Sequence, residues 1–246
     1  MDPLFDFTEK VVLITGGSRG LGYQMTKAFA ERGANIIIAS RKIDACEQVA
    51  TEVRAMGRKA LAVGTHVGKW KECDALIEAA YNSFGRVDIL INNAGMSPAC
   101  PSHEVSEQLF DTVMNLNFKG PFRLASQIGH RMKQAGSGVI INISSSGALT
   151  PLPAVIPYGG AKAALNAMSV SLAHELKPHV RVNTISAGPF LTDIANAWSP
   201  EARQKQPVAL GRPGQPNEIV TAALMMASDA SSYTTGALLR VDGGMA

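Results

Sequence analysis

Short apolar runs alternate along the chain with longer stretches in which apolar residues recur at helical spacing. Strands that are apolar throughout and alternate with helices are typical of a parallel sheet buried on both faces. The pattern therefore predicts an α/β fold: one doubly wound parallel sheet of about seven strands with helices on both faces. The expected strands are Val11–Ile14, Asn35–Ala39, Ala60–Val63, Ile89–Asn92, Val139–Ile143, Arg181–Ile185 and Ala237–Val241. The expected helices lie near residues 20–32, 43–56, 69–84, 104–134, 157–177 and 216–228.

No repeat, linker or low-complexity tract interrupts this alternation, so we expect residues 1–246 to form a single domain. The proline-rich segment 189–214 breaks the rhythm. Long irregular segments inside compact domains are often active-site lids. We therefore predict that residues 189–214 form a mobile lid over a substrate site.

Composition excludes several classes of protein. Hydrophobic residues make up 46% of the chain and charged residues 17%, which is enough apolar material for a substantial core. The formal charge of +3 comes from dispersed residues, so nucleic acid is not an expected partner. The apolar runs are far shorter than the roughly 20 residues of a membrane span, and the first residues lack the pattern of a secretory signal. Three widely spaced cysteines without a metal-ligand cluster indicate a reduced, cytoplasmic protein without a metal site.

Tyr158 and Lys162 are four positions apart in the helix expected near 157–177. At this spacing the ammonium can lie near the phenol, favour the phenolate and lower the tyrosine pKa from about 10 towards working pH. Such a tyrosine can exchange protons with a substrate. Gly159 and Gly160 weaken a helix interior, which predicts that something bulky approaches the backbone there. Taken alone, the pair more often means an exposed tyrosine covered by a lysine stem, so the context decides.

The context begins with Thr15-Gly16-Gly17-Ser18-Arg19-Gly20-Leu21-Gly22, directly after the first expected strand. Glycines allow a sharp turn and a close approach to phosphate, and the N-terminus of the following helix offers free N–H groups. The spacing is G-x-x-x-G-x-G rather than G-x-G-x-x-G, and a plain glycine-rich connector is the alternative. The position between strand and helix favours a Rossmann-type dinucleotide site, formed by Gly16, Ser18, Arg19, Gly20, Leu21 and Gly22.

The second expected strand ends in Ala39-Ser40-Arg41-Lys42, where NAD sites usually offer a carboxylate to the ribose. Here no acid is present. Ser40 can hydrogen-bond a 2′-phosphate, Arg41 can pair with it and stack on adenine, and Arg19 can reach the same phosphate. Alternatively, Arg41 and Lys42 only begin a solvated helix. The sequence therefore predicts that NADP(H) is favoured over NAD(H).

Further motifs follow in order: Asn92-Asn93-Ala94-Gly95, Asn117, Ser144-Ser145, Gly188-Pro189 with Thr192, and Asp242-Gly243-Gly244. Together with the glycine-rich turn and Tyr158-x-x-x-Lys162, they make the chain resemble the short-chain dehydrogenase/reductase family of the classical type over nearly its whole length. It is similar in particular to the 3-oxoacyl-(acyl-carrier-protein) reductase-like members.

The resemblance implies a role for four residues. Tyr158 would be the general acid in reduction and the general base in oxidation, and Lys162 would lower its pKa and hold the nicotinamide ribose. Ser145 would hydrogen-bond the substrate oxygen, although aligning Gly147 with the family favours Ser144 instead. Asn117 would hold a water that relays protons to Lys162. Each serine or asparagine, taken alone, is equally a turn or helix residue that bonds its own backbone.

The resemblance also implies cofactor and substrate contacts. His66 stands where relatives usually carry an aspartate beside adenine, and Ala187 replaces the proline of the usual P-G pair. We expect further cofactor contacts from Val67, Asn93, Ala94, Gly95, Gly188, Phe190 and Thr192, and substrate contacts from Met96, Phe190 and Trp198, in addition to Ser145 and Tyr158.

The leading hypothesis is an NADP(H)-dependent carbonyl reductase or alcohol dehydrogenase that acts on a neutral or partly hydrophobic ketone. The alternative is a non-catalytic NADP-binding module with a redox-sensing or structural role, which would need the glycines but not the acid. Family likeness also predicts a homotetramer, with the helices near 104–134 and 157–177 and the last strand at its interfaces.

Overall fold

Runs of Val, Ile and Leu form the centre of the structure, a computed structural model that describes residues 2–150 and 152–245. These runs make one parallel sheet in the order β3-β2-β1-β4-β5-β6-β7. All five residues of β1 are buried, as expected of a strand covered on both faces. Every predicted strand is found, with its ends shifted by two residues or fewer. The strands are β1 Val11–Thr15, β2 Asn35–Ser40, β3 Ala60–Gly64, β4 Ile89–Asn92, β5 Gly138–Ser145, β6 Val180–Ala187 and β7 Leu238–Val241.

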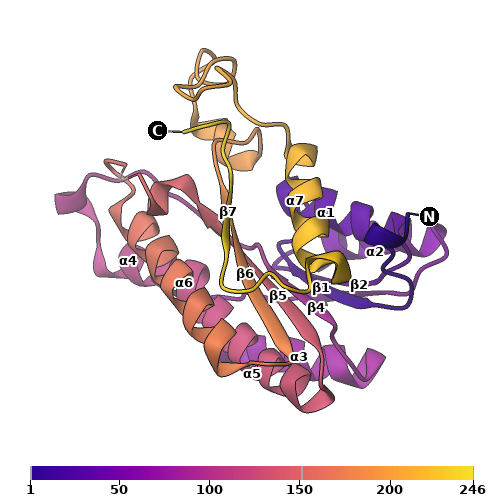
Figure 1. Ribbon diagram of the computed structural model, residues 1–246. Coiled ribbons are helices and arrows are strands. Elements are labelled where there is room, and N and C mark those ends of the chain that lie inside the picture. Colours follow the sequence, from indigo (N-terminus) through magenta and orange to yellow (C-terminus); the bar gives the residue numbers. More distant parts are fainter. Residues whose placement is uncertain (1, 151, 246) are drawn as a thin grey trace.

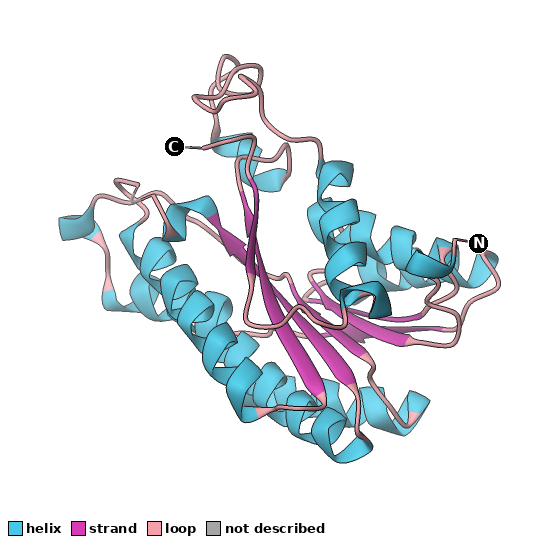
Figure 2. Ribbon diagram, in the orientation of Figure 1, coloured by secondary structure: helices cyan, strands magenta, loops and turns pink. Residues whose placement is uncertain are grey.

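Helices cover both faces of the sheet in a single domain, which confirms the predicted fold class (Figures 1 and 2). Helices α1, α2 and α7 pack on one face against alternate β1 and β2 residues, among them Ile14 and Ile38. Helices α3, α5 and α6 pack on the other face against Leu13 and Ile37. The helices are α1 Gly20–Glu31, α2 Ile43–Ala55, α3 Trp70–Phe84, α4 Glu107–Met114, α5 Gly120–Ala135, α6 Ile156–Glu175 and α7 Val220–Ala227.

The long helix predicted near 104–134 is corrected in two ways. It begins at Glu107, because the Ser106 side chain accepts a hydrogen bond from the Leu109 amide (3.1 Å) and caps the first turn. It is also interrupted by a π-helical stretch at Asn115–Lys119, between α4 and α5. Single π turns inside helices occur frequently at functional sites. The predicted helix near 216–228 is likewise divided, into a 3₁₀ turn at Pro216–Ile219 followed by α7.

The sheet places its functional edge where the strand order reverses. Strand β1 pairs with β2 on one side and with β4 on the other, although β4 follows much later in the chain. Ligands of open α/β sheets bind in the crevice outside the carboxyl ends of the strands at such a point. The glycine-rich turn follows β1, and the N-N-A-G motif begins at the end of β4, so both lie at this crevice.

Residues 189–214 form a loop that is closed at its base. The Gly214 amide donates to the Pro189 carbonyl, and the Leu191 amide donates to the Gly214 carbonyl, both at 2.9 Å. The far part of the loop pairs with the C-terminal tail, since Leu210 donates to the Gly243 carbonyl at 2.9 Å. In Figure 1 this loop lies at the top, beyond the end of β6 and close to the C-terminus. Its mobility stays a prediction.

Candidate active site

The glycine-rich turn forms a tight cradle at the N-terminus of α1. Gly16 and Gly20 have positive φ values of 65° and 54°, a region that side chains disfavour. At Gly22 an added Cβ would lie 2.1 Å from the Gly16 carbonyl oxygen, so only glycine fits. The side chain of Arg19, the N-cap residue, does not cap α1, which leaves the amides of the first turn available to an anion. The turn therefore fits the pyrophosphate of a dinucleotide.

The N-N-A-G motif is hydrogen-bonded directly to this cradle. The Asn93 side chain donates to the Thr15 carbonyl at 2.9 Å and to the Gly16 carbonyl at 3.3 Å. In return the Thr15 hydroxyl accepts from the Asn93 and Ala94 amides at 3.0 and 3.1 Å. Gly95, at the end of the motif, is exposed, and an added Cβ there would lie 2.8 Å from the Asn117 amide oxygen. Predicted cofactor residues from two distant segments thus line one crevice.

Asn117 is fully buried in the π-helical stretch. Its side-chain nitrogen donates to the Met96 and Val113 carbonyls, both at 2.9 Å, and its oxygen accepts from the Met96 amide at 3.3 Å. The alternative to a functional role was a helix asparagine that bonds its own backbone, and the bond to Val113, four residues earlier, is of that kind. The structure shows that bond and, in addition, places Asn117 between Met96 and the crevice wall at Gly95.

Tyr158 and Lys162 lie on α6, one turn apart, with the lysine beneath the phenol. The Lys162 ammonium lies 5.9 Å from the centroid of the Tyr158 ring and is only 3% exposed. It donates to the Ile143 carbonyl at 2.7 Å, at the end of β5. Tyr158 itself is half-buried. The alternative interpretation, an exposed tyrosine covered by a lysine stem, is therefore wrong for this chain, because the lysine is the buried member of the pair.

Burial shifts both groups towards their neutral forms. It raises the pKa of Tyr158 above 10, and a hydrogen bond with the Ser145 side chain partly offsets this rise. It lowers the pKa of Lys162 from 10.5 to about 8. The sequence predicted a lowered tyrosine pKa, and the structure gives the opposite direction. The reason is that desolvation by burial outweighs the hydrogen bond with Ser145, which acts in the other direction.

The two candidate serines occupy different environments. The Ser145 hydroxyl contacts the Tyr158 phenol and accepts the Gly147 amide at 3.1 Å. The Ser144 hydroxyl is 3% exposed and faces the Lys162 carbonyl at 3.4 Å. Only Ser145 shares with Tyr158 a position from which both hydroxyls can meet one substrate oxygen.

Sequence reasoning explained the two glycines after Tyr158 by a bulky neighbour, and the structure corrects this. At Gly159 the neighbour is protein: an added Cβ would lie 3.0 Å from the Gly147 carbonyl oxygen. At Gly160 an added Cβ would meet no described atom within 4 Å, and the residue is exposed. Gly159 thus lets the turn that carries Ser145 pack onto α6, whereas Gly160 has no such partner among the described residues.

At the expected adenine end, the Ser18 and Ser40 hydroxyls are hydrogen-bonded to each other at 2.7 Å. Arg41 next to them is exposed and forms no ion pair with a described residue. The His66 ring nitrogen Nδ1 accepts from the Gly68 amide at 3.2 Å, which fixes the ring in its loop. Val67 is 4% exposed, so its side chain belongs to the core. The predicted cofactor residues Ser18 and Ser40 are thus in contact, and Arg41 follows Ser40 in the chain, whereas Arg19, predicted to reach the same phosphate, pairs with Asp193.

Residues in and around the loop at 189–214, the predicted lid, are divided between core and crevice. The Phe190 ring is 6% exposed and packs against Gly214, where an added Cβ would lie 2.7 Å from it, so this side chain serves the core. The Thr192 side chain lies over the glycine-rich turn, 3.4 Å from the Cβ position of Gly20. At Gly188 an added Cβ would be 2.4 Å from the Asp242 Cα, which explains this glycine by packing. Trp198 and Met96 are half-buried.

One contact at the site had no signal in the sequence. Asp193 of the loop at 189–214 forms an ion pair with Arg19 of the glycine-rich turn, with a distance of 2.5 Å between Oδ2 and Nη1. The two residues are far apart in the chain, and both are common surface types. Only the folded chain shows that the lid and the turn meet through them.

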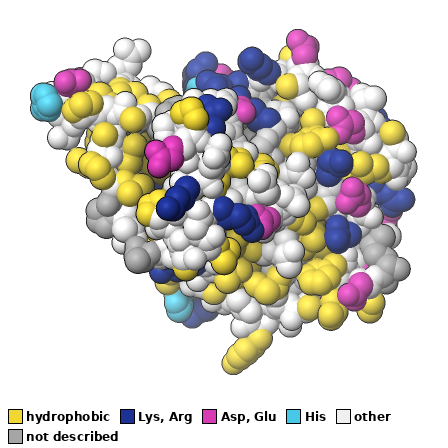
Figure 3. Space-filling model, turned by 90° about the horizontal axis from the view of Figure 1, so that it is seen from above, with side chains coloured by type: hydrophobic (Ala, Val, Ile, Leu, Met, Phe, Trp, Pro, Cys, Tyr) yellow, Lys and Arg dark blue, Asp and Glu magenta, His cyan; other side chains and the backbone are white. Residues whose placement is uncertain are grey.

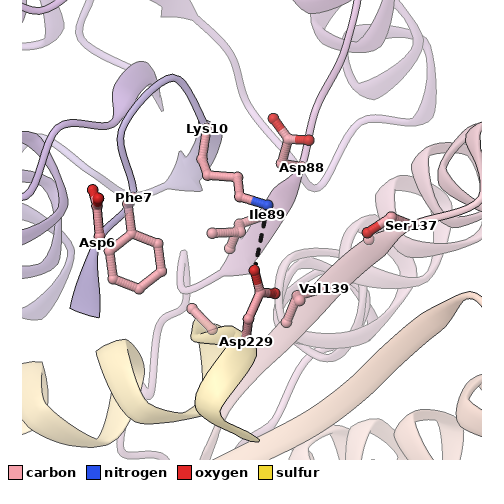
Figure 4. Close-up of a pocket in the computed structure, with 10 residues that line it drawn as sticks. Asp6, Phe7, Lys10, Asp88, Ile89, Ser137, Val139 and Asp229 are labelled. Atoms are coloured by element: carbon pink, nitrogen blue, oxygen red, sulfur yellow. Dashed lines mark ion pairs between the residues drawn. The ribbon is translucent and has the colours of Figure 1, made fainter. Parts of the chain in front are cut away.

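A small hollow lies at the opposite, amino edge of the sheet (Figure 4). Its volume is about 20 Å³, room for a single water, and Lys10 faces Asp229 across it at 3.7 Å. It is too small for a dinucleotide or its substrate. Within residues 2–150 and 152–245 no group of three or more His, Cys, Asp or Glu side chains is arranged to hold a metal ion. None of the helices in the described part is long and apolar enough to span a membrane.

The fold and the cradle define a Rossmann-type, dinucleotide-binding α/β protein with a tyrosine and a lysine at its crevice. Residues 10–203 match the family model described as short chain dehydrogenase. The chain belongs to the short-chain dehydrogenase family. It is thus an oxidoreductase that uses a nicotinamide cofactor, NAD or NADP, and acts on small alcohol or ketone substrates.

Similar proteins cover almost the whole chain. The 3-oxoacyl-[acyl-carrier-protein] reductase FabG of Chlamydia trachomatis is 36% identical over 96% of this chain and 97% of its own. The 3alpha-hydroxysteroid dehydrogenase of Mediterraneibacter gnavus is 35% identical over 95% of this chain and 96% of its own. A solved 7 alpha-hydroxysteroid dehydrogenase in complex with NADH and 7-oxo glycochenodeoxycholic acid superposes with a TM-score of 0.94. It is 31% identical and covers 99% of this chain and 97% of its own.

Proposed function

We propose that the protein is an NADP(H)-dependent carbonyl reductase or alcohol dehydrogenase in which Tyr158 is the general acid and base. One observation carries the proposal. The Tyr158 phenol contacts the Ser145 hydroxyl above a buried Lys162, at the crevice that also holds the glycine cradle. A protein that only bound the cofactor would need the cradle but not this arrangement.

Ser145 and Tyr158 have different roles towards the oxygen atom of the substrate. Ser145 donates a hydrogen bond to the substrate carbonyl, and Tyr158 donates the proton that the oxygen gains on reduction. In oxidation the proton moves back from the alcohol to Tyr158. The bound nicotinamide supplies or accepts the hydride at the carbon.

Lys162 and Asn117 would support this proton transfer. The Lys162 pKa of about 8 lies close enough to neutral pH for the ammonium to give up and regain a proton. Its partner in the structure is the Ile143 carbonyl, and its Nζ and the Asn117 side-chain oxygen lie 3.7 and 2.8 Å from one point, the Cβ position of Gly95. Lys162 would also hold the nicotinamide ribose, with Asn93 and Thr192 forming other parts of the crevice wall.

The preference for NADP(H) is supported by this chain's own residues. Ser18 and Ser40 present paired hydroxyls at the end of β2, and the exposed side chain of Arg41 follows. A guanidinium pairs well with a phosphate, whereas NAD sites offer a carboxylate at this place. The related 7 alpha-hydroxysteroid dehydrogenase structure contains NADH, so the preference for NADP(H) is inferred from Ser40 and Arg41 of this chain alone.

The substrate class follows from the apolar rim of the site. Leu149, Leu152 and Ile156 are 43%, 40% and 59% exposed and lie in the segment between Ser145 and Tyr158. Seen from above, hydrophobic side chains gather at the left of Figure 3, the side on which Figure 1 shows α4. A rim of this kind favours a neutral, partly hydrophobic ketone. Relatives named for steroids and 3-oxoacyl groups are consistent with this class.

Two further expectations accompany the proposal. The reduced cysteines, of which Cys46 and Cys73 are buried, favour a cytoplasmic location. Exposed aromatic side chains on the outer helices favour assembly into a homotetramer. These side chains include Trp70, Phe110 and Phe122.

The experiment is a scan of NADPH oxidation over a chemically varied ketone panel, with NADH run in parallel at the same low concentration. We expect turnover of apolar ketones with NADPH and a lower kcat/KM with NADH. Equal efficiency with the two cofactors would contradict the NADP(H) assignment. Absence of turnover on every ketone would favour the non-catalytic binding module.

A further inference from the structure

The Arg19–Asp193 ion pair joins the two segments that enclose the cofactor crevice. Arg19 is the N-cap residue of α1 in the glycine-rich turn, and Asp193 begins the 3₁₀ helix at Asp193–Ala197 in the lid. The charged atoms approach to 2.5 Å. Both side chains are more than half exposed, at 66% and 56%, so solvent and dissolved anions can reach them. The contact can therefore form and break without unfolding any element.

The neighbouring residues hold the same two segments together. The Thr192 side chain lies 3.4 Å from the Cβ position of Gly20, directly beside the ion pair. The lid is thus seated on the turn by a van der Waals contact as well as by charge. Asp193 remains next to Arg19 as long as Thr192 stays against Gly20, which keeps a carboxylate at the mouth of an anion-binding cradle.

Arg19 cannot serve two anions equally well. The proposed phosphate site is formed by Ser40 and Arg41, and Ser18, which precedes Arg19, is bonded to Ser40 at 2.7 Å. A phosphate monoester carries between one and two negative charges near neutral pH. Its approach to Arg19 must therefore either displace the Asp193 carboxylate or accept a like charge beside it. A ribose without a 2′-phosphate neither displaces the Asp193 carboxylate nor brings a like charge beside it.

We propose that Asp193 is a specificity-determining residue, which reduces the preference for a 2′-phosphorylated dinucleotide by holding Arg19 in the ion pair. The inference rests on the proposed function, which places the 2′-phosphate at Ser40 and Arg41. It assigns Asp193 a role in the balance between the two cofactors and none in the transfer of the proton.

The test measures dissociation constants of NADPH and NADH for the full chain and its variants. The variants are Asp193→Asn, Arg19→Met and the double variant. Glu201→Gln is the matched control, because it removes the same charge from the same lid and Glu201 forms no ion pair with a described residue. Thermal unfolding of each variant checks that the fold is retained.

We expect Asp193→Asn to tighten NADPH by about two- to five-fold, the size of an exposed ion pair, with NADH unchanged. Arg19→Met should weaken NADPH, and adding Asp193→Asn to it should then have no effect on the ratio of the two constants. Glu201→Gln should leave that ratio as in the wild type.

Three results would overturn the proposal: an unchanged ratio in Asp193→Asn, an equal shift for both cofactors, or the same gain in the Arg19→Met background. An equal gain in Glu201→Gln would also overturn it, because lid charge alone would then suffice. A wild-type protein that binds NADH more tightly contradicts the proposed cofactor instead. In that case the role of Asp193 is still decided by whether the ratio of the NADPH and NADH dissociation constants differs between the wild type and Asp193→Asn.

Discussion

The buried Lys162 ammonium affects stability as well as chemistry. Its pKa of about 8 in the folded chain lies below the ordinary 10.5, because burial disfavours the charged form. Between these values the unfolded chain binds more protons than the folded one, so stability rises with pH. In a Lys162→Met variant this contribution is absent.

We therefore compare the free energy of unfolding of the wild type with that of Lys162→Met at pH 8 and at pH 10. The difference, wild type minus variant, should be about 2 kcal/mol larger at pH 10 than at pH 8. Urea denaturation at the two pH values measures it. Lys71→Met, at an exposed position on α3, is the control and should run parallel to the wild type. A constant difference between wild type and Lys162→Met across this range would mean that Lys162 is not held with a lowered pKa.

The two serines at the end of β5 offer a direct comparison at the residue scale. Ser145→Ala removes the hydroxyl beside Tyr158, and kcat should fall by about 10²- to 10³-fold, as for other donors to a developing oxyanion. Ser144→Ala removes only a long bond to the Lys162 carbonyl and should keep kcat within a few-fold. Steady-state kinetics on a ketone substrate decides between them. A larger loss in Ser144→Ala would reverse the assignment.

At the scale of elements, the glycines of α6 give opposite expectations. Gly160→Ala adds a methyl group in open space at an ordinary helical position, so the free energy of unfolding should rise by about 0.5–1 kcal/mol. Gly159→Ala places its methyl 3.0 Å from the Gly147 carbonyl and should lose that gain. Denaturant unfolding of both variants tests this. A Gly159→Ala variant as stable as Gly160→Ala would show that the turn carrying Ser145 yields easily.

The strands could be predicted because each is a short apolar run bounded by turn residues, whereas their order in the sheet was not predicted. The interruption of the helix predicted near 104–134 could not. The π-helical stretch accompanies bonds from the Asn117 side chain to Met96 and Val113, and the contact with Met96 is remote in sequence. An apolar pattern records which face of a helix is buried, but not a local change in its winding.

The site could be predicted wherever a local motif determines geometry. The Gly16–Gly22 turn follows β1 and the Tyr158 and Lys162 pair lies on α6, where their motifs indicated, while the roles of these residues stay predictions. The pKa directions were not predictable, because they depend on burial that only the folded chain provides. The Phe190 ring in the core and the Arg19–Asp193 pair likewise depend on how the lid packs.

At the scale of the whole molecule, the outer helices and the last strand leave large apolar side chains exposed. They include Trp70 on α3, Phe110 on α4, Phe122 on α5, Val170 on α6 and Leu238 on β7. Burial of these side chains between copies of the chain would remove them from water. We expect light scattering to give four times the 26.0 kDa of one chain. A mass of one chain at micromolar concentration would contradict the tetramer.

The most direct measurement compares the wild type with Tyr158→Phe, in NADPH binding and in ketone reduction. The phenylalanine keeps the ring above Lys162 but cannot donate a proton. We predict wild-type affinity for NADPH together with a fall in kcat of about 10²- to 10⁴-fold, the usual contribution of a general acid. A Tyr158→Phe protein that binds NADPH and still reduces the ketone at close to the wild-type rate would contradict the account.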